Sequence, residues 1–134
     1  LCGDACEGYY FSTHYAAAGA TGATKEFIDT YNKKYGYVPG DVAALTYDAM
    51  KIALQAIQAT GGLTGDLATD RALVRDQLAQ IKDFEGITGR MTFTEEGDPI
   101  KCAVIVKIQG GEFTYYSQAC PPELETKEKA EATE

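Results

Sequence analysis

The chain has few of the residues from which catalytic and metal sites are usually built. Its 134 residues include a single histidine, His14, and no G-x-S-x-G motif or cysteine-centred signature accompanies that base. The four cysteines do not form paired C-x-x-C motifs, and one histidine does not complete a usual zinc set. The sequence therefore predicts neither an enzyme nor a metal site, and no residue is assigned a catalytic role.

The signatures of cofactor binding are missing as well. The glycine-rich segments 19–22 and 61–65 lack the lysine of a phosphate-binding loop and do not match the dinucleotide fingerprint. They are typical of turns, so no cofactor is expected. The acidic pair Glu95 and Glu96 lies in a predicted turn, which indicates a solvated surface rather than a catalytic dyad.

Positive charge is scarce. The chain has 12 Lys and Arg against 20 Asp and Glu, a net charge of -8, so it lacks the clustered basic side chains that nucleic acid requires. Its longest uncharged run, 52–65, is too short and too polar to cross a hydrocarbon layer of about 30 Å. Hydrophobic residues make up 45% of the chain, which is enough for a globular core.

Hydrophobic periodicity predicts a mixed α/β chain. Alternating aromatic and polar residues over 7–15 indicate a strand, and a helix is expected from Thr24 to a stop at Gly36. A second helix over 42–59, with Asp41 as its N-cap, is expected to be mostly buried, and a third is expected over 70–82. The second helix carries a thin polar stripe, which consists of Asp48, Lys51, Gln55 and Gln58.

The C-terminal part predicts strands followed by a polar tail. Residues 88–94 alternate as a strand before a turn at 95–99, and the runs 102–108 and 113–120 predict a β-hairpin. Residues 121–134 hold only one large apolar side chain, Leu124, so this segment is expected to be a disordered acidic tail.

The hairpin places two cysteines near each other. Cys102 would lie close to Cys120 across the ladder, and a disulfide is predicted there. Cys2 and Cys6 are poorly aimed for a bridge on a helix, so their disulfide is the less expected one and would need a non-helical turn, which Gly3 permits. Either bridge would indicate an extracytoplasmic compartment; the alternative is four small buried thiols.

Two places have the character of a binding site. Residues 12–15 form a polar cluster at the C-terminal end of the first predicted strand, and in open α/β sheets ligands bind beyond the carboxyl ends of strands. The alternative is an ordinary strand end with a surface histidine. Tyr47 lies early in the apolar helix, where its hydroxyl faces a wet cleft or, alternatively, bonds to the backbone of the core.

Four segments occur in an order that resembles a known family: Gly8 to Tyr15, Thr24 to Pro39, Ala44 to Met50, and Gly86 to Asp98. Together they resemble the C-terminal third of type I periplasmic binding proteins, and in particular the leucine/isoleucine/valine-type substrate-binding subunits of amino-acid ABC transporters. The likeness covers about residues 1–118.

The resemblance implies an α/β fold that is a C-terminal fragment of a two-lobed, periplasmic-binding-protein-like (type I) structure. In such proteins the lobes close over a small amino acid or related solute, and a membrane permease reads the closure. Residues 1–40 would belong mostly to the second lobe, 41–87 mostly to the first lobe after a hinge crossing, and 88–120 to the C-terminal strands.

Site residues follow from the same resemblance. Tyr47 matches a tyrosine that contacts ligand, while Thr13 and His14 lie on a loop at the mouth of the pocket. Asp48 is common at its position in the family and is at least as consistent with a structural role.

The chain begins at Leu1 without an initiator methionine. We therefore expect a fragment of a periplasmic or extracellular protein whose missing N-terminal part carries most of the site. Exposed sheet edges and an unburied helix would favour self-association of such a fragment. Two other readings stay open, namely the extracellular ligand-sensing domain of a signalling receptor and an independently folded interaction module.

Overall fold

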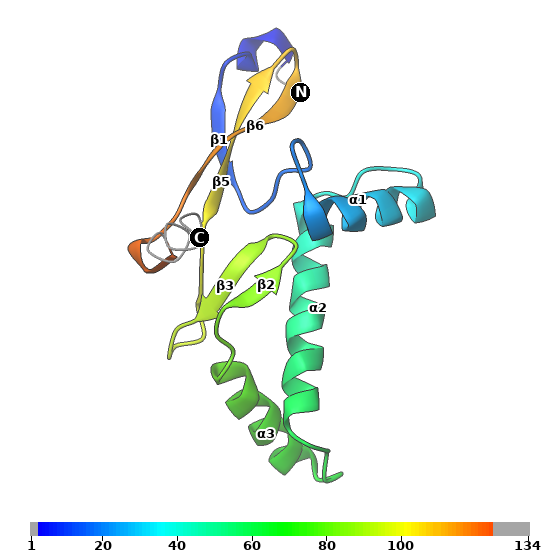
Figure 1. The fold of residues 1–134 in the computed structure, drawn as a ribbon, viewed down its shortest axis with the longest axis vertical. Coiled ribbons are helices and arrows are strands. Elements are labelled where there is room, and N and C mark those ends of the chain that lie inside the picture. The colour runs from blue at the N-terminus through cyan, green and yellow to red at the C-terminus, as the bar shows by residue number, and fades with distance from the viewer. Residues whose placement is uncertain (1–2, 125–134) are drawn as a thin grey trace.

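The structure, a computed structural model, describes residues 3–124. They form a mixed α/β fold with two antiparallel sheets, ordered β1-β5-β6 and β2-β3-β4 (Figure 1). The helical elements are η1 (Gly3–Cys6), α1 (Gly22–Tyr35), α2 (Asp41–Ala59) and α3 (Leu67–Ala79). The strands are β1 (Tyr10–Thr13), β2 (Phe84–Gly86), β3 (Gly89–Phe93), β4 (Pro99–Lys101), β5 (Ala103–Gln109) and β6 (Glu112–Ala119).

The two sheets lie at different levels of the molecule. In Figure 1 the β1-β5-β6 sheet occupies one end and α3 the other, and the second sheet lies between them beside the long helix α2. No helix formed by residues 3–124 combines the length and the apolar character that a membrane crossing requires.

Helix α1 ends where the sequence predicts. Gly36 takes the left-handed conformation with a φ of 82°, and its N–H donates to the carbonyl of Asn32 at 2.8 Å, as glycine does at the end of many helices. The next helix begins one position earlier than expected. Gly40 is the N-cap of α2, and Asp41 is its first residue.

Helix α2 is buried along only one face. Its buried residues include Ala44 and Asp48, whereas Val42 and Met50 on the other side are 73% and 59% exposed. The expectation of a mostly buried helix was therefore wrong, because the described chain packs against one side only. The predicted polar stripe was also wrong at Asp48, which is 2% exposed and faces inward.

The apolar core has two parts. One cluster packs α2 and α3 against the second sheet, and the other packs the start of α2 against the chain that leaves β1. The first cluster consists of Ile52, Ala56, Ile81, Phe84 and Met91. The second consists of Tyr15, Ala44 and Ile87.

Two helices on either side of the predicted boundary at residues 40 and 41 are in contact. Helix α1 packs on α2, since the rings of Phe27 and Tyr47 lie 4.9 Å apart between centroids. Thr24 Oγ1 also donates to the carbonyl of Ile87 at 2.9 Å. The expected boundary between residues 40 and 41 therefore separates two helices that pack together. The assignment of these ranges to two lobes stays a prediction.

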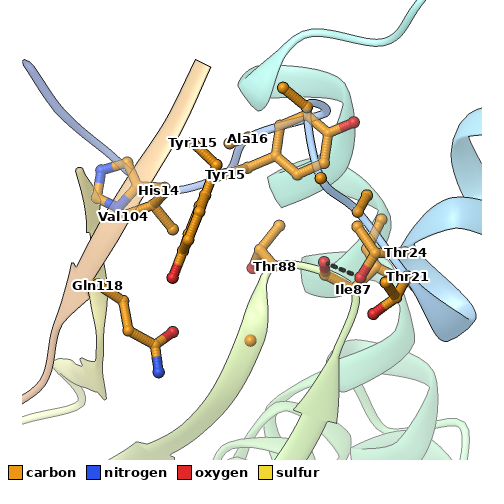
Figure 2. Close-up of a pocket in the computed structure, with 14 residues that line it drawn as sticks. His14, Tyr15, Ala16, Thr21, Thr24, Ile87, Thr88, Val104, Tyr115 and Gln118 are labelled. Carbon is orange, nitrogen blue, oxygen red and sulfur yellow. Dashed lines mark hydrogen bonds between the residues drawn. The ribbon is translucent and has the colours of Figure 1, made fainter. Parts of the chain in front are cut away.

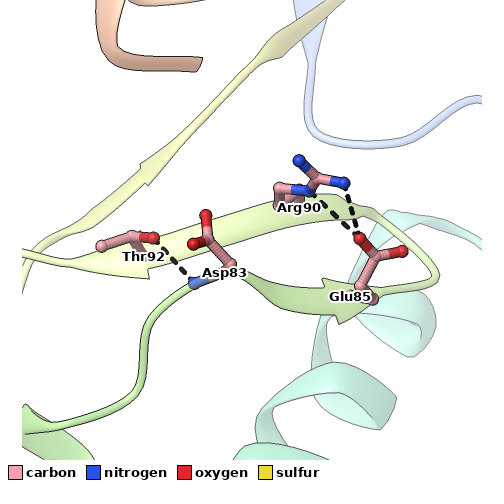
Figure 3. A network of polar contacts seen from close by, with 4 residues as sticks. All are labelled: Asp83, Glu85, Arg90 and Thr92. Atoms are coloured by element: carbon pink, nitrogen blue, oxygen red, sulfur yellow. Dashed lines mark hydrogen bonds and ion pairs between the residues drawn. The ribbon is translucent and has the colours of Figure 1, made fainter. Parts of the chain in front are cut away.

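The second sheet contains a strand that the sequence did not reveal. β2 has only three residues, and it pairs antiparallel with β3 in the register Phe84 to Met91. Side chains hold this short hairpin (Figure 3): Arg90 Nε and Nη2 donate to Glu85 Oε1 at 3.1 and 2.8 Å. The backbone N–H of Asp83 donates to Thr92 Oγ1 at 2.9 Å.

The C-terminal hairpin forms as predicted, with Ala103 to Gln109 paired to Glu112 to Ala119. Cys102 and Cys120 are joined by a disulfide. Cys6 is also disulfide-bonded. The less expected bridge between Cys2 and Cys6 involves Cys2, which lies outside the described residues.

The prediction of a disordered tail over 121–134 was wrong at residues 122–124. Residues 122–124 are helical, and Leu124 is only 5% exposed. Leu124 lines a small cavity with Arg90 and Val104, so the single large apolar side chain of the tail is buried against the fold. The rest of the predicted tail, 125–134, lies outside the described residues.

Helix α3 begins at Leu67, three residues before the predicted start at Asp70. Asp66 caps it, since its carboxylate accepts a hydrogen bond from Thr69 N at 2.8 Å. Asp70 then accepts from the N–H and hydroxyl of Thr64 at 2.7 and 2.8 Å. Two carboxylates thus define this helix start.

These two carboxylates make the start of α3 sensitive to acid. Hydrogen bonds from Thr69 lower the pKa of Asp66 below 3.8, and those from Thr64 do the same for Asp70. The stability that they contribute is present above the ordinary pKa and is lost as pH falls through the lowered values. When the pH is lowered past about 4, the amide protection factors in α3 should therefore decrease before those in α2 do.

The double variant Asp66→Asn/Asp70→Asn should lose this pH dependence, because an amide does not titrate. Asp76→Asn, which changes an exposed carboxylate on the same helix, is the matched control and should keep it. Protection of α3 that stays constant from pH 5 to the acid limit would contradict the assignment.

Candidate functional site

A buried carboxylate joins α2 to the turn between β2 and β3. Asp48 accepts hydrogen bonds from the N–H of Ile87 at 2.9 Å, the N–H of Thr88 at 2.9 Å and the hydroxyl of Thr88 at 2.7 Å. Both carboxylate oxygens are engaged, which offsets the cost of burying the charge. Asp48 therefore fixes the position of the β2–β3 turn on the helix.

Gly86 lets the carboxylate approach the turn. A side-chain carbon at this position would lie 2.5 Å from Asp48 Oδ2 and 2.8 Å from its Cγ, which is closer than atoms pack. Gly86 has no positive φ, so the need for glycine is one of space and not of backbone conformation.

Lys101 extends this contact to the end of β4. Its Nζ donates to Thr88 Oγ1 at 2.8 Å and lies 3.5 Å from the carbonyl of His14. Burial lowers the pKa of Lys101, and the charge of Asp48 opposes that shift. A chain of hydrogen bonds thus runs from Lys101 through Thr88 to Asp48, and it reaches the segment that leaves β1.

Directly beside this chain of hydrogen bonds lies a cavity of about 270 Å³ between the two sheets, here called the inter-sheet cavity. Three parts of the structure line it: the loop from β1 to α1, the β2–β3 turn and the β5–β6 hairpin (Figure 2). Its hydrogen-bonding side chains come from His14, Tyr15, Thr21, Thr24, Thr88, Tyr115 and Gln118.

The lining is polar but carries no carboxylate. One of its groups lacks a partner within the described residues, since the hydroxyl of Tyr15 is buried without a hydrogen bond. Burial also raises the pKa of Tyr15. This hydroxyl is enclosed by protein and does not face the open cavity, so it is an unpaired polar group of the core, where a hydroxyl normally finds a partner.

The three predicted ligand-binding residues lie at three different cavities. His14 lines the inter-sheet cavity. Thr13 faces a second cavity of about 510 Å³ beside Phe11 and Phe113. Tyr47 lies on a third, of about 500 Å³, along the exposed side of α2. The described chain does not bring them together, and their role in ligand binding stays a prediction.

The sequence did not identify Thr88 and Lys101, which form the chain of hydrogen bonds to Asp48, or Gln118, which lines the inter-sheet cavity. Only Asp48 gave a usable signal, because a carboxylate within an apolar helix must find donors elsewhere in the chain. Nothing in the sequence near Thr88 identifies it as that donor. Within residues 3–124, no group of three or more His, Cys, Asp or Glu could hold a metal ion.

Comparison with known proteins identifies the family. Residues 1–112 match the family model described as periplasmic binding protein. The chain belongs to this family. A search of curated proteins finds no match.

Solved structures of this family share the fold. The chain is 32% identical to a leucine-binding protein, LivK, from Thermotoga maritima, with a TM-score of 0.75 over 91% of this chain and 33% of that one. It is 29% identical to LivJ from Streptococcus pneumoniae, solved in complex with isoleucine, with a TM-score of 0.69 over 84% and 30% of the two chains.

A third match is a solute-binding protein of an ABC transporter from Rhodopseudomonas palustris in complex with 3,4-dihydroxybenzoic acid. It is 27% identical, with a TM-score of 0.68 over 88% of this chain and 32% of that one. The chain thus spans about a third of the length of these structures, and it has the fold of a fragment of a type I periplasmic binding protein.

The carboxylate of Asp48 should be indispensable to the fold. In Asp48→Asn, the amide nitrogen would face an N–H or O–H donor, and Lys101 would lose its buried counter-charge. We expect the free energy of unfolding to fall by about 3 kcal/mol, measured by urea denaturation. The control Asp29→Asn removes an exposed partner of Lys25 and should cost no more than about 0.5 kcal/mol.

Gly86→Ala should be destabilising for a different reason, because its methyl group would displace the Asp48 carboxylate. We expect a loss of about 2 kcal/mol in the same measurement. Gly40→Ala is the control, since Gly40 has an ordinary φ and open space around it, and it should cost only the N-cap preference, less than about 1 kcal/mol. Equal stability of the Gly86→Ala protein and the parent chain would refute this account of the turn.

Proposed function

We propose that this chain is part of an extracytoplasmic solute-binding protein that captures an amino acid between two lobes and delivers it to an ABC transporter permease. The observation that carries the proposal is the inter-sheet cavity. It lies where the chain leaves the first sheet, over 14–21 on the way to α1, and where the chain enters that sheet again from the second sheet at Lys101 to Ala103. Binding rather than catalysis is the role that fits its lining.

The proposed solute is a branched-chain amino acid or a related small carboxylate. LivJ holds isoleucine and the R. palustris protein holds an aromatic acid, so both are reasonable probes. The described lining of the inter-sheet cavity offers hydroxyl, imidazole and amide groups without a carboxylate. A partner for an ammonium group would therefore come from the remainder of a longer protein.

In this proposal His14 contacts the solute within the inter-sheet cavity, while Thr13 and Tyr47 contribute from neighbouring surfaces. The β1-β5-β6 sheet would belong to one lobe. The helices and the second sheet would belong to the other. The segments 14–21 and 101–103 would then be hinge crossings. The disulfide Cys102–Cys120 supports an extracytoplasmic location.

Calorimetric titration with isoleucine tests this function. The longer parent protein should bind isoleucine, and His14→Ala in that protein should weaken binding by about tenfold through loss of one hydrogen bond to a charged group. Lys25→Ala, on the exposed face of α1, is the control and should bind like the unmodified protein. Absence of isoleucine and aromatic-acid binding by the parent would contradict the proposal.

The 134-residue chain alone should show no titratable binding of isoleucine, because it supplies only part of the site. Submicromolar binding by this chain would instead favour an independent module. A second function, ligand sensing for a signalling receptor of the same fold, would be favoured by a membrane span and a signalling region elsewhere in the parent polypeptide.

We also propose that the isolated chain self-associates through the exposed side of α2. Met50 is 59% and Leu54 is 52% exposed on that helix, and an apolar face of this kind favours association. Light scattering coupled to gel filtration should report a mass above that of the monomer, and Leu54→Lys should lower it. Gln80→Lys, the same kind of exposed polar change but at the end of α3, is the control; a monomeric unmodified chain would refute the proposal.

A further inference from the structure

The Cys102–Cys120 disulfide lies at the joint between the two sheets. Cys102 is the single residue between β4 of the second sheet and β5 of the first. Cys120 directly follows β6, and the two Cα atoms are 4.1 Å apart. The cross-link therefore closes the hairpin at the end where its first strand enters from the other sheet.

The ladder of the hairpin ends next to the disulfide. Ala103 to Ala119 is the last pair of the ladder, and Pro121 and Pro122 cannot extend it because proline has no N–H. Beyond them, Leu124 is buried and lines a small cavity with Gly89 and Arg90 at the start of β3. The segment that follows Cys120 therefore reaches the second sheet through Leu124.

The same end of the hairpin forms a wall of the inter-sheet cavity. Val104 and Gln118 are partners in the β5–β6 ladder, and both line the inter-sheet cavity as well as the small cavity beside Leu124 (Figure 2). They lie two residues from Cys102 and Cys120, respectively. A change in the hairpin end would therefore move this wall relative to Thr88 on the other side.

We propose that the Cys102–Cys120 disulfide is a brace that fixes the angle between the two sheets and so sets the width of the inter-sheet cavity. A dithiol reductant would release it: the S–S bond accepts two electrons and two protons, two cysteine thiols form, and the reductant becomes a disulfide. The segment at Lys101 to Ala103 would then bend more freely. The consequence for solute binding rests on the proposed function, whereas the mechanical role does not.

Electron spin resonance distances between the sheets test the brace in the 134-residue chain. Nitroxides would be attached through ketone-bearing residues at Glu95 and Glu112, which are exposed and lie at the β3–β4 and β5–β6 turns. The intact chain should give a narrow distance distribution. Cys102→Val/Cys120→Ala, which keeps apolar groups but removes the link, should at least double its width.

Two controls separate the brace from other effects. Cys2→Ser/Cys6→Ser removes the remaining cysteines and should leave the distribution narrow. Leu124→Ala keeps the disulfide, and its distance distribution should also stay narrow. If the distribution of Leu124→Ala were as broad as that of the reduced chain, the proposal would be overturned, even if the Cys102→Val/Cys120→Ala variant does not fold. An unchanged distribution in a folded Val/Ala variant would overturn it as well.

Solute binding is measured separately in the longer parent protein. Removal of the disulfide should weaken isoleucine binding several-fold there, because a freer joint populates the binding geometry less often. Failure of the parent to bind isoleucine would contradict the proposed function and leave the distance result standing. Normal binding together with an unchanged distance distribution would contradict the brace alone.

Discussion

The structure depends above all on the burial of one carboxylate. Asp48 accepts three hydrogen bonds from Ile87 and Thr88, and those bonds place the β2–β3 turn on α2. Thr88 in turn accepts from Lys101, which brings the end of β4 to the same point. A helix, a hairpin and an incoming strand therefore share one charged centre, and the inter-sheet cavity lies directly beside it.

This centre explains why the cavity is polar and yet well defined. A cavity between two small sheets would be easily deformed if only apolar contacts held them, because such contacts are not directional. Here the wall carrying Thr88 is fixed by hydrogen bonds to the charged side chains of Asp48 and Lys101, and the opposite wall belongs to a hairpin closed by a disulfide. The chain leaves the first sheet over 14–21 and enters it again from the second sheet at Lys101 to Ala103.

Periodicity and turn residues predicted the local structure well. The stop of α1 at Gly36, the C-terminal hairpin and the order of the three long helices all follow from patterns within a few residues of each other. The short strands β2 and β4 carry no such pattern and were missed. The resemblance to periplasmic binding proteins was confirmed by the family match. Local signals sufficed for these features, because helix caps, turn glycines and the alternation of apolar and polar residues each determine the structure of only one turn or one strand.

The errors arose where distant parts of the chain meet. Asp48 was placed on a polar stripe because its helix neighbours suggested one, and its donors lie about 40 residues further on. Leu124 looked like part of a tail because its partners belong to β3. His14, Thr13 and Tyr47 lie at three different cavities of the described chain, and their role in ligand binding stays a prediction.

The pairing of β1 with β5 has a consequence for how the molecule is made. Tyr10 pairs with Lys107, and Glu7 accepts hydrogen bonds from Gly110 and Gly111 at the tip of the hairpin. Among the described residues, the strand that pairs with β1 emerges during synthesis only after nearly all of the others. The helices and the second sheet, whose contacts are closer in sequence, can form first. The first sheet is therefore the last part to assemble, and its aromatic side chains stay open to other molecules until then.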